Sequence, residues 1–236
     1  MSMMSHRASL LLAIAALALV TPAPIHAWRL NDTALERVPL PAGAHVVAAG
    51  TSADFDRDGI AETLVLIEGR AAIRTGSQIR WQSPQAWQVR QAVIADLDRD
   101  GLPEAALLVW RPFKPWPVDK WLPNGGRIDD FHDARGMSCH IILIGWYHDS
   151  FRERWAGSAL AAPVDHLAAA DLRGNGRGYL VTLEGTYDDA MQAPSRHLKV
   201  WEWNGFGFSL VYELPGSFSL MATTQMQDGQ VLILSD

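Results

Sequence analysis

Short apolar runs bounded by glycine, aspartate or asparagine recur along the chain after residue 27. They are rich in β-branched and long aliphatic residues, which is typical of strands. One set follows acidic or glycine-containing loops, at residues 63–69, 105–110, 178–185 and 230–236. A second set precedes the same loops, at residues 46–55, 89–97, 166–172 and 218–226. The pattern therefore predicts an all-β chain made of four similar strand–loop–strand units.

Further strands are expected after each of the first three of these pairs. Their ranges are 71–74 and 78–82, 139–148 and 151–157, and 197–203 and 208–214. The last two are joined through Asn204-Gly205, a strong hairpin signal. The fourth unit ends with the chain. Its other half is expected near the beginning, where Ala27–Asp32 is similar to Val200–Gly205 and a further apolar stretch follows at 35–40.

This repeat predicts a small β-propeller of four blades, with one blade closed by the N- and C-terminal strands. Closure of this kind leaves no long unpaired sheet edge. Residues 28–236 form the single propeller domain and give about 52 residues for each blade, close to the usual repeat. The expected blades are about 42–85, 86–160 with an insertion at 111–136, 161–215, and 216–236 together with 28–41. Five blades are the alternative prediction if the insertion contains extra strands.

Two of the loops have nearly the same acidic sequence. They read Asp54-Phe-Asp-Arg-Asp-Gly-Ile-Ala-Glu62 and Asp96-Leu-Asp-Arg-Asp-Gly-Leu-Pro-Glu104, with carboxylates at positions 1, 3, 5 and 9 and glycine at position 6. Alternating carboxylates before a glycine can wrap the chain around a hard cation, and calcium takes six to eight oxygen ligands. The loops are not EF-hands, because position 12 is Val65 or Leu107 instead of glutamate.

The repeated sequence Ala-Asp-x-Asp-Arg-Asp-Gly-x-x-Glu, placed between strands, resembles the FG-GAP or VCBS-type repeats of bacterial and integrin-like β-propellers. In that family the loop between the first two strands of a blade binds calcium. The resemblance implies two calcium ligand sets, with carbonyl oxygens from Ile60 and Leu102: Asp54, Asp56, Asp58, Ile60 and Glu62, and Asp96, Asp98, Asp100, Leu102 and Glu104. The alternative is a pair of solvated acidic turns without an ion.

The other two loops depart from this pattern. The third copy has Arg173 in place of the carboxylate at position 3 and Tyr179 in place of the glutamate at position 9. Its guanidinium is expected to take the space of the ion. The fourth copy offers only Asp228. We therefore expect two calcium ions and not four.

Residues 1–27 have the features of a cleaved secretory signal peptide. A short polar start precedes the apolar run Leu10–Val20, and Ile25-His26-Ala27 approximates a cleavage site. The apolar run is short for a membrane span, which needs about 20 residues. We expect export to a periplasm or to the medium, with no stable membrane span after cleavage.

The net charge argues against one class of partner, and the cysteine content bears on disulfides. The formal net charge is −6, and removal of residues 1–27 takes away Arg7 and makes it −7. An acidic chain without basic clusters argues against nucleic acid as a partner. The single cysteine, Cys139, excludes an internal disulfide, and its apolar neighbours indicate a buried residue.

Two long connections are expected on the face opposite the acidic loops, at 111–136 and 186–196. Long loops on a rigid scaffold commonly carry binding residues. The candidate ligand-face residues are Trp116, Trp121, Phe131, His132, Tyr187 and Asp188. Two interpretations stay open: the aromatic residues bind a ligand, or they fold back as a lid over this face.

The sequence does not favour an enzyme. It lacks a Gly-x-Ser-x-Gly elbow, a His-Glu-x-x-His pair, a Cys-x-x-Cys pair and a phosphate-binding glycine loop. The expected function is an exported, calcium-stabilised, non-catalytic binding or scaffold module with a protein partner. The alternative is a carbohydrate-binding or carbohydrate-active protein that stacks sugars on Trp116, Trp121 and Tyr187, so a glycan is the second candidate ligand.

Overall fold

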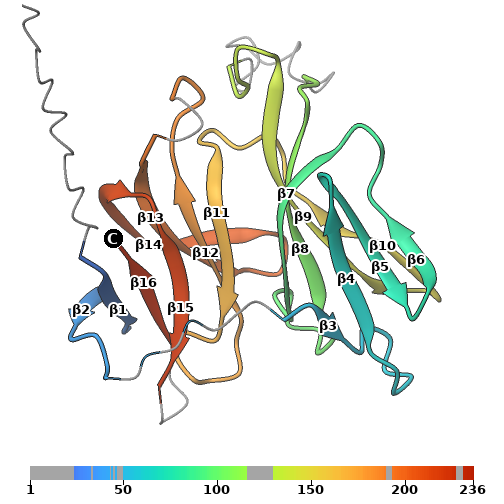
Figure 1. The fold of residues 1–236 in the computed structure, drawn as a ribbon, viewed down its shortest axis with the longest axis horizontal. Coiled ribbons are helices and arrows are strands. Elements are labelled where there is room, and N and C mark those ends of the chain that lie inside the picture. The colour runs from blue at the N-terminus through green and yellow to red at the C-terminus, as the bar shows by residue number, and fades with distance from the viewer. Residues whose placement is uncertain are drawn as a thin grey trace, which may run out of the picture.

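The computed structural model describes residues 24–32, 34–42, 44, 46, 50–115, 130–189, 193–226 and 231–236. These residues form four antiparallel sheets of four strands each, arranged as a four-bladed β-propeller (Figure 1). The described part of the chain contains no helix, and hence none long and apolar enough to cross a membrane. The predicted all-β class, the four blades and the propeller architecture are confirmed.

Blades 1 to 3 run in chain order from an inner to an outer strand, and blade 4 combines the last two strands of the chain with the first two. Blade 1 contains β3 (Ser52–Ala53), β4 (Glu62–Ile67), β5 (Arg70–Thr75) and β6 (Gln78–Gln82). Blade 2 contains β7 (Gln88–Ala95), β8 (Glu104–Pro112), β9 (Met137–Tyr147) and β10 (Ser150–Ala156). Blade 3 contains β11 (Val164–Ala170), β12 (Tyr179–Glu184), β13 (Ser195–Trp203) and β14 (Phe208–Phe218). Blade 4 contains β15 (Met221–Gln225), β16 (Val231–Ser235), β1 (His26–Leu30) and β2 (Leu35–Val38).

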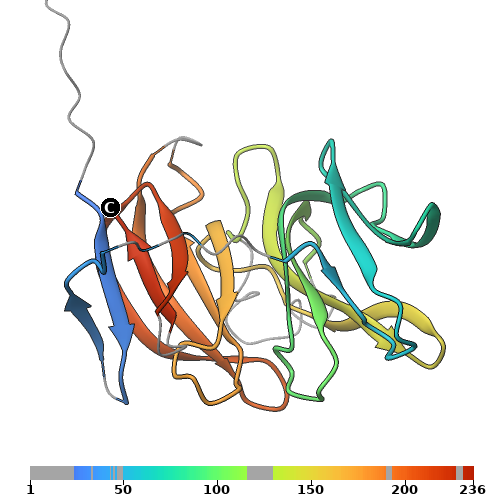
Figure 2. The same ribbon diagram turned by 60° about the horizontal axis from the view of Figure 1, so that its bottom comes forward.

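Blade 4 is completed by both ends of the chain, as predicted. In Figure 2 the blue β1 lies beside the red β16, and the two pair antiparallel, with Trp28 opposite Ile233. The indole Nε1 of Trp28 also donates a 2.9 Å hydrogen bond to Ser235 Oγ. The expected cleavage point after Ala27 lies inside β1, so cleavage there would leave Trp28–Leu30 of this strand in the sheet.

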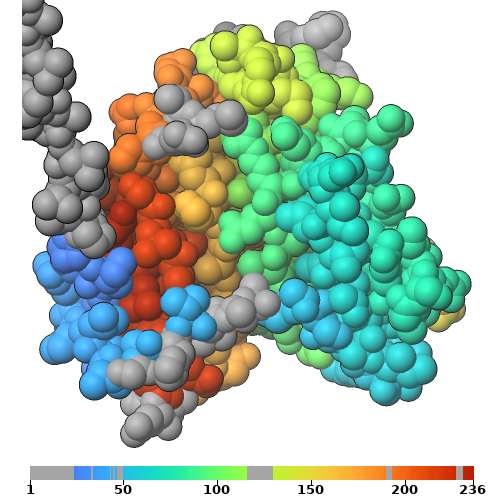
Figure 3. All heavy atoms as spheres, in the orientation of Figure 1, coloured from blue at the N-terminus to red at the C-terminus, as the bar shows by residue number. Residues whose placement is uncertain are grey.

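The hydrophobic core lies between neighbouring blades. Three of the four boundaries between blades hold a cluster of fully buried residues. These include Phe55, Ile73 and Ile142 between blades 1 and 2, Leu97, Leu143 and Leu180 between blades 2 and 3, and Leu172, Val200 and Ile233 between blades 3 and 4. In Figure 3 blades 1 and 2 form the teal and green half, and blades 3 and 4 form the other half. Burial between sheets is the main driving force that holds the blades together.

The innermost strand of blade 1 is much shorter than predicted. A strand was expected over 46–55, but β3 covers only Ser52–Ala53, and Gly50 and Thr51 are outside it. Val46 instead forms an isolated antiparallel bridge with Thr224 of β15. The prediction was wrong here because this segment carries the chain from blade 4 to blade 1, and Val46 pairs with the blade it leaves.

Candidate metal centres

The two acidic loops connect the inner two strands of blades 1 and 2. The first acidic loop, residues 54–62, joins β3 to β4, and the second acidic loop, residues 96–104, joins β7 to β8. Position 4 is an arginine with φ of 61° or 66°, and position 6 is a glycine with φ of 85° or 86°. Because these unusual backbone angles recur at the same two positions, the loops share one conformation.

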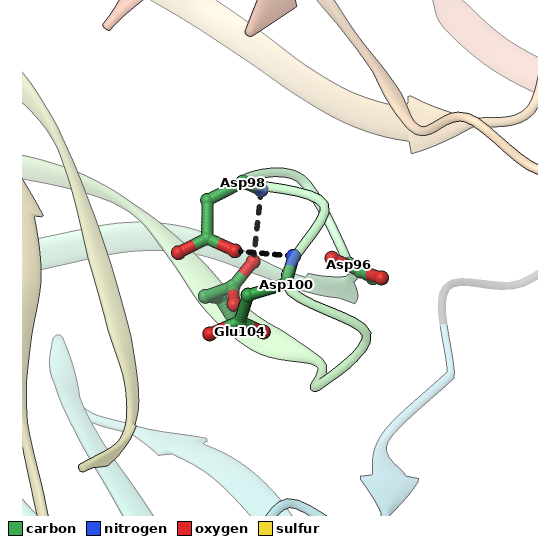
Figure 4. Close-up of side chains that lie close together, drawn as sticks. All are labelled: Asp96, Asp98, Asp100 and Glu104. Atoms are coloured by element: carbon green, nitrogen blue, oxygen red, sulfur yellow. Dashed lines mark hydrogen bonds between the residues drawn. The ribbon is translucent and has the colours of Figure 1, made fainter. Parts of the chain in front are cut away.

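In the second acidic loop, each aspartate has one oxygen fixed by the backbone. The amide of Gly101 donates to Asp96 Oδ2 at 3.0 Å, that of Asp100 to Asp98 Oδ1 at 3.0 Å, and that of Leu102 to Asp100 Oδ1 at 2.8 Å. These bonds leave the second oxygen of each aspartate for another partner. Figure 4 shows the four carboxylates whose oxygens lie within 4.8 Å of one another: Asp96, Asp98, Asp100 and Glu104.

Glu104 is the buried member of this cluster. Its Oε2 accepts hydrogen bonds from the amides of Leu97 at 2.9 Å and Asp98 at 3.3 Å. Burial first, and then the charge of Asp98, raise the pKa of Glu104 to about 8. Burial also raises the pKa of Asp96. The cluster therefore resists holding its full negative charge without a cation.

The first acidic loop repeats the same bonds. The amide of Gly59 donates to Asp54 Oδ2 at 3.0 Å, that of Asp58 to Asp56 Oδ1 at 3.1 Å, and that of Ile60 to Asp58 Oδ1 at 2.7 Å. The oxygens within 4.8 Å of one another come from three residues: Asp54, Asp56 and Asp58. Glu62 is not part of this group.

The position-9 glutamate of the first loop makes the same bond to the position-2 amide as Glu104 does, and a further bond to β5. Glu62 Oε2 accepts from the amide of Phe55 at 3.0 Å, and Oε1 accepts from Thr75 Oγ1 at 3.2 Å. The ligand role of Glu62 stays a prediction, as do those of the Ile60 and Leu102 carbonyls.

One carboxylate oxygen in each acidic loop is buried and unpaired. These atoms are Asp54 Oδ1 and Asp96 Oδ1, which have no hydrogen-bond partner among the described residues. A buried carboxylate oxygen without a partner is costly, so such atoms are uncommon unless an unseen ligand completes them. Because both occupy position 1 and belong to the clustered residues, the two clusters could hold a metal ion.

The third loop, residues 171–179, provides an internal comparison. Asp171 Oδ2 again accepts from the position-6 amide, here Gly176 at 2.6 Å. Its Oδ1, however, accepts from the position-5 amide, that of Asn175, at 3.1 Å. In the two acidic loops the position-5 amide donates to the position-3 aspartate instead. Arg173 at position 3 cannot accept that bond. Both oxygens of Asp171 are therefore satisfied by the loop itself, and the described residues show no acidic cluster here.

Arg173 also binds acceptors on the next blade. Its guanidinium donates to the carbonyl of Asn31 at 3.2 Å, lies 3.7 Å from Asp32, and lies 5.6 Å from the centre of the ring of Tyr179 at position 9. That it takes the space of an ion stays a prediction. The fourth loop, with Asp228, lies outside the described residues.

Two arginines that the sequence analysis did not single out lie beside the acidic loops. Arg154 on β10 donates to Asp98 Oδ2 at 3.3 Å and to Asp100 Oδ2 at 2.6 Å. Arg80 on β6 lies 4.0 Å from Asp56 Oδ2. The available signal was the repeated Arg-Trp dipeptide in the fourth strand of blades 1 and 2.

On the opposite face, the structure describes four of the six candidate ligand-face residues, since Trp116 and Trp121 lie outside the described ranges. Phe131 and His132 are half-buried, and the His132 ring lies 5.1 Å from that of Phe113. Asp188 is exposed. The structure therefore leaves Asp188 as the most accessible of these four candidates.

Tyr187 anchors the smaller connection to blades 2 and 3. Its hydroxyl donates to the Leu160 carbonyl at 2.8 Å and accepts from the Cys139 amide at 3.1 Å, and its ring packs edge-on against Trp110 at 5.8 Å. These contacts favour the lid interpretation for Tyr187 and weaken its role as a surface for stacking sugars.

No protein-family model matches this sequence, and a search of curated proteins finds no match for it. The resemblance to FG-GAP and VCBS-type repeats therefore remains a prediction from the two acidic loops. The structure places these loops between the first two strands of propeller blades and brings their aspartates together.

Proposed function

We propose that this chain is an exported, calcium-stabilised β-propeller of the FG-GAP or VCBS type that acts as a non-catalytic binding module for a protein partner. Residues 1–27 would be its secretory signal, and the mature chain would work in a periplasm or in the medium. The observation that carries the calcium assignment is the pair of buried, unpaired oxygens at Asp54 and Asp96.

The donor set fits calcium. Both clusters offer carboxylate oxygens only, without histidine or cysteine, which is the ligand chemistry of a hard cation. In both loops, backbone amides bind one oxygen of each aspartate, so the second oxygen of each aspartate is the one that an ion would take. The ion would neutralise a crowded acidic loop and lock the inner two strands of its blade. At a calcium concentration ten times the Kd, each site would stabilise the fold by about 1.4 kcal/mol.

The binding role rests on the scaffold and its long connections. The β8–β9 and β12–β13 connections lie at the end of the propeller opposite the acidic loops. They come from neighbouring blades, and Tyr187 of the β12–β13 connection packs against Trp110 near the end of β8. A rigid scaffold that presents long loops suits recognition of another protein. Phe131 and the tryptophans Trp116 and Trp121 are the proposed contact residues.

A crosslinked pull-down from the native extracytoplasmic fraction tests this role. The bait is the mature chain in calcium, compared with a Trp116→Ala/Trp121→Ala/Phe131→Ala variant. The control is Phe206→Ala, which removes an aromatic side chain that is 88% exposed at the opposite end of blade 3. We expect wild type and the control to capture the same protein and the triple variant to lose it. Equal capture by the triple variant, or no capture by any bait, would contradict the proposal.

A further inference from the structure

The two acidic loops differ in how closely a neighbouring arginine side chain binds their aspartates. In the first acidic loop, the oxygens left over by the backbone are Asp54 Oδ1, Asp56 Oδ2 and Asp58 Oδ2. The only described cation within 4.0 Å of them is Arg80, at 4.0 Å from Asp56, and it forms no hydrogen bond there. Arg80 donates instead to Thr75 Oγ1 at 3.2 Å.

In the second acidic loop, an arginine holds two of the three equivalent oxygens. Arg154 Nη2 donates to Asp100 Oδ2 at 2.6 Å and to Asp98 Oδ2 at 3.3 Å. Only Asp96 Oδ1 is left without a partner. The guanidinium is therefore bonded to the same atoms that an ion would need. Of its two charge-assisted bonds, the short one to Asp100 is the strong one.

We propose that Arg154 is a built-in competitor for the metal, which makes the second acidic loop the weaker of the two ion sites. This inference rests on the calcium sites proposed above. An ion can reach Asp98 Oδ2 and Asp100 Oδ2 only when the guanidinium gives up these bonds. The like charge of a guanidinium that stays nearby lowers the affinity further.

Arg154 has another position to occupy when it leaves the aspartates. Its guanidinium already lies 4.8 Å from the centre of the exposed Tyr147 ring, a cation–π arrangement. Arg154 also lines a surface hollow of about 500 Å³, together with Asp98, Asp100, Tyr147 and Trp203 among others. Ion binding in the second loop therefore releases the guanidinium from the two aspartates into this hollow, beside Tyr147.

Calorimetric titration with calcium chloride of single-loop variants of the mature chain tests the inference. Asp56→Asn disables the first loop and leaves the second. In that background, Arg154→Gln is expected to tighten calcium binding by about tenfold or more, and Arg154→Lys, which keeps a charge but loses the planar fork, by less. Asp96→Asn leaves the first loop, where Arg80→Gln is expected to tighten binding by less than about threefold.

The outcomes separate this inference from the calcium proposal. If both single-loop chains bind calcium but Arg154→Gln and Arg154→Lys leave the second loop unchanged or weaker, Arg154 is not a competitor, while the calcium sites stand. If neither loop binds calcium in any variant, both ideas fall. Thermal unfolding in chelator verifies the fold of each variant, and Arg154→Lys alone carries the test if Arg154→Gln does not fold.

Discussion

The side-chain amide of Gln91 on β7 forms two hydrogen bonds of 2.8 Å with the backbone of Leu167 on β11. Its Nε2 donates to the Leu167 carbonyl, and its Oε1 accepts from the Leu167 amide. The register of β7 against β8 shifts between Val89 and Gln91, and this bulge lies where Gln91 meets the next blade. The side chain thus replaces a strand partner at the boundary of blades 2 and 3.

Removal of the two hydrogen bonds between Gln91 and Leu167 is expected to destabilise the fold. Gln91→Ala leaves the amide and carbonyl of Leu167 without these partners, so we expect a loss of about 1–3 kcal/mol in the free energy of unfolding. Urea denaturation measures it. Gln88→Ala, at an exposed position of the same strand, serves as the control and should change stability by less than about 0.5 kcal/mol. Equal stability of both variants would show that the two Gln91–Leu167 hydrogen bonds contribute nothing to the free energy of unfolding.

Gly178 in the third loop supports the second acidic loop from the neighbouring blade. A Cβ at this position would lie 2.7 Å from the backbone oxygen of Asp96, which is too close. Gly178→Ala is therefore expected to cost about 1–3 kcal/mol and to weaken calcium binding by the second loop. Gly50→Ala is the control, since a Cβ there meets no atom of the described residues within 4 Å. Unchanged binding and stability in Gly178→Ala would contradict the packing described for this contact.

Tyr187 is expected to act through structure and not through a ligand. Tyr187→Phe leaves the Cys139 amide and the Leu160 carbonyl without the hydroxyl, which should lower the free energy of unfolding by about 1–3 kcal/mol. Asp188→Asn, at the exposed neighbour, should be close to neutral. Denaturation curves of the two variants provide the comparison. A neutral Tyr187→Phe that loses partner capture would instead assign Tyr187 to the binding surface.

His140 should make the fold sensitive to acid. Its ring is buried, with Nδ1 3.0 Å from the Gly157 carbonyl and Nε2 2.7 Å from Ser138 Oγ. Burial first, with a smaller effect from Arg111, lowers the pKa of His140 to about 4 from its ordinary 6.5. Between these two values the unfolded chain binds more protons, so the stability contributed by neutral His140 is present above pH 6.5 and is lost as the pH falls toward 4.

This loss amounts to about 2 kcal/mol between pH 7 and pH 5 for His140 alone. The measurement is the difference in unfolding free energy between wild type and His140→Gln at both pH values, with calcium absent. The difference should shrink by that amount on acidification. Gln88→Ala, which removes no titratable group from an exposed position, serves as the control and should show no such change. A constant difference between wild type and His140→Gln would contradict the buried, neutral ring.

Most of the fold could be predicted from local patterns. The apolar runs beside the two acidic loops and the third and fourth loops became β4, β7, β8, β11, β12 and β16, with shifts of a few residues at their ends. The similarity of Ala27–Asp32 to Val200–Gly205 indicated that β1 completes the last blade. Val46 escaped prediction because its apolar character fits a strand in either blade, and only the bridge to Thr224 decides between them.

The candidate metal centres were predictable only in part. The spacing of Asp96, Asp98 and Asp100 was sufficient to place their oxygens together, because the bonds that orient them lie within the same loop. The contact of Arg154 with Asp100 joins residues 54 positions apart, so it depends on the way β10 packs beside the loop. The repeated Arg-Trp dipeptide marks the two fourth strands as similar, but it does not show that the arginine lies beside the acidic loop.

The central claim is that the two acidic loops bind calcium. Its most direct test is calorimetric titration of residues 28–236 with calcium, alongside an Asp54→Asn/Asp96→Asn variant that neutralises the two position-1 side chains, whose Oδ1 atoms are unpaired. We predict two bound ions for wild type, none for the variant, and a melting temperature that chelator lowers only in wild type. Absence of binding heat in wild type, together with a melting temperature that chelator leaves unchanged, would contradict the claim.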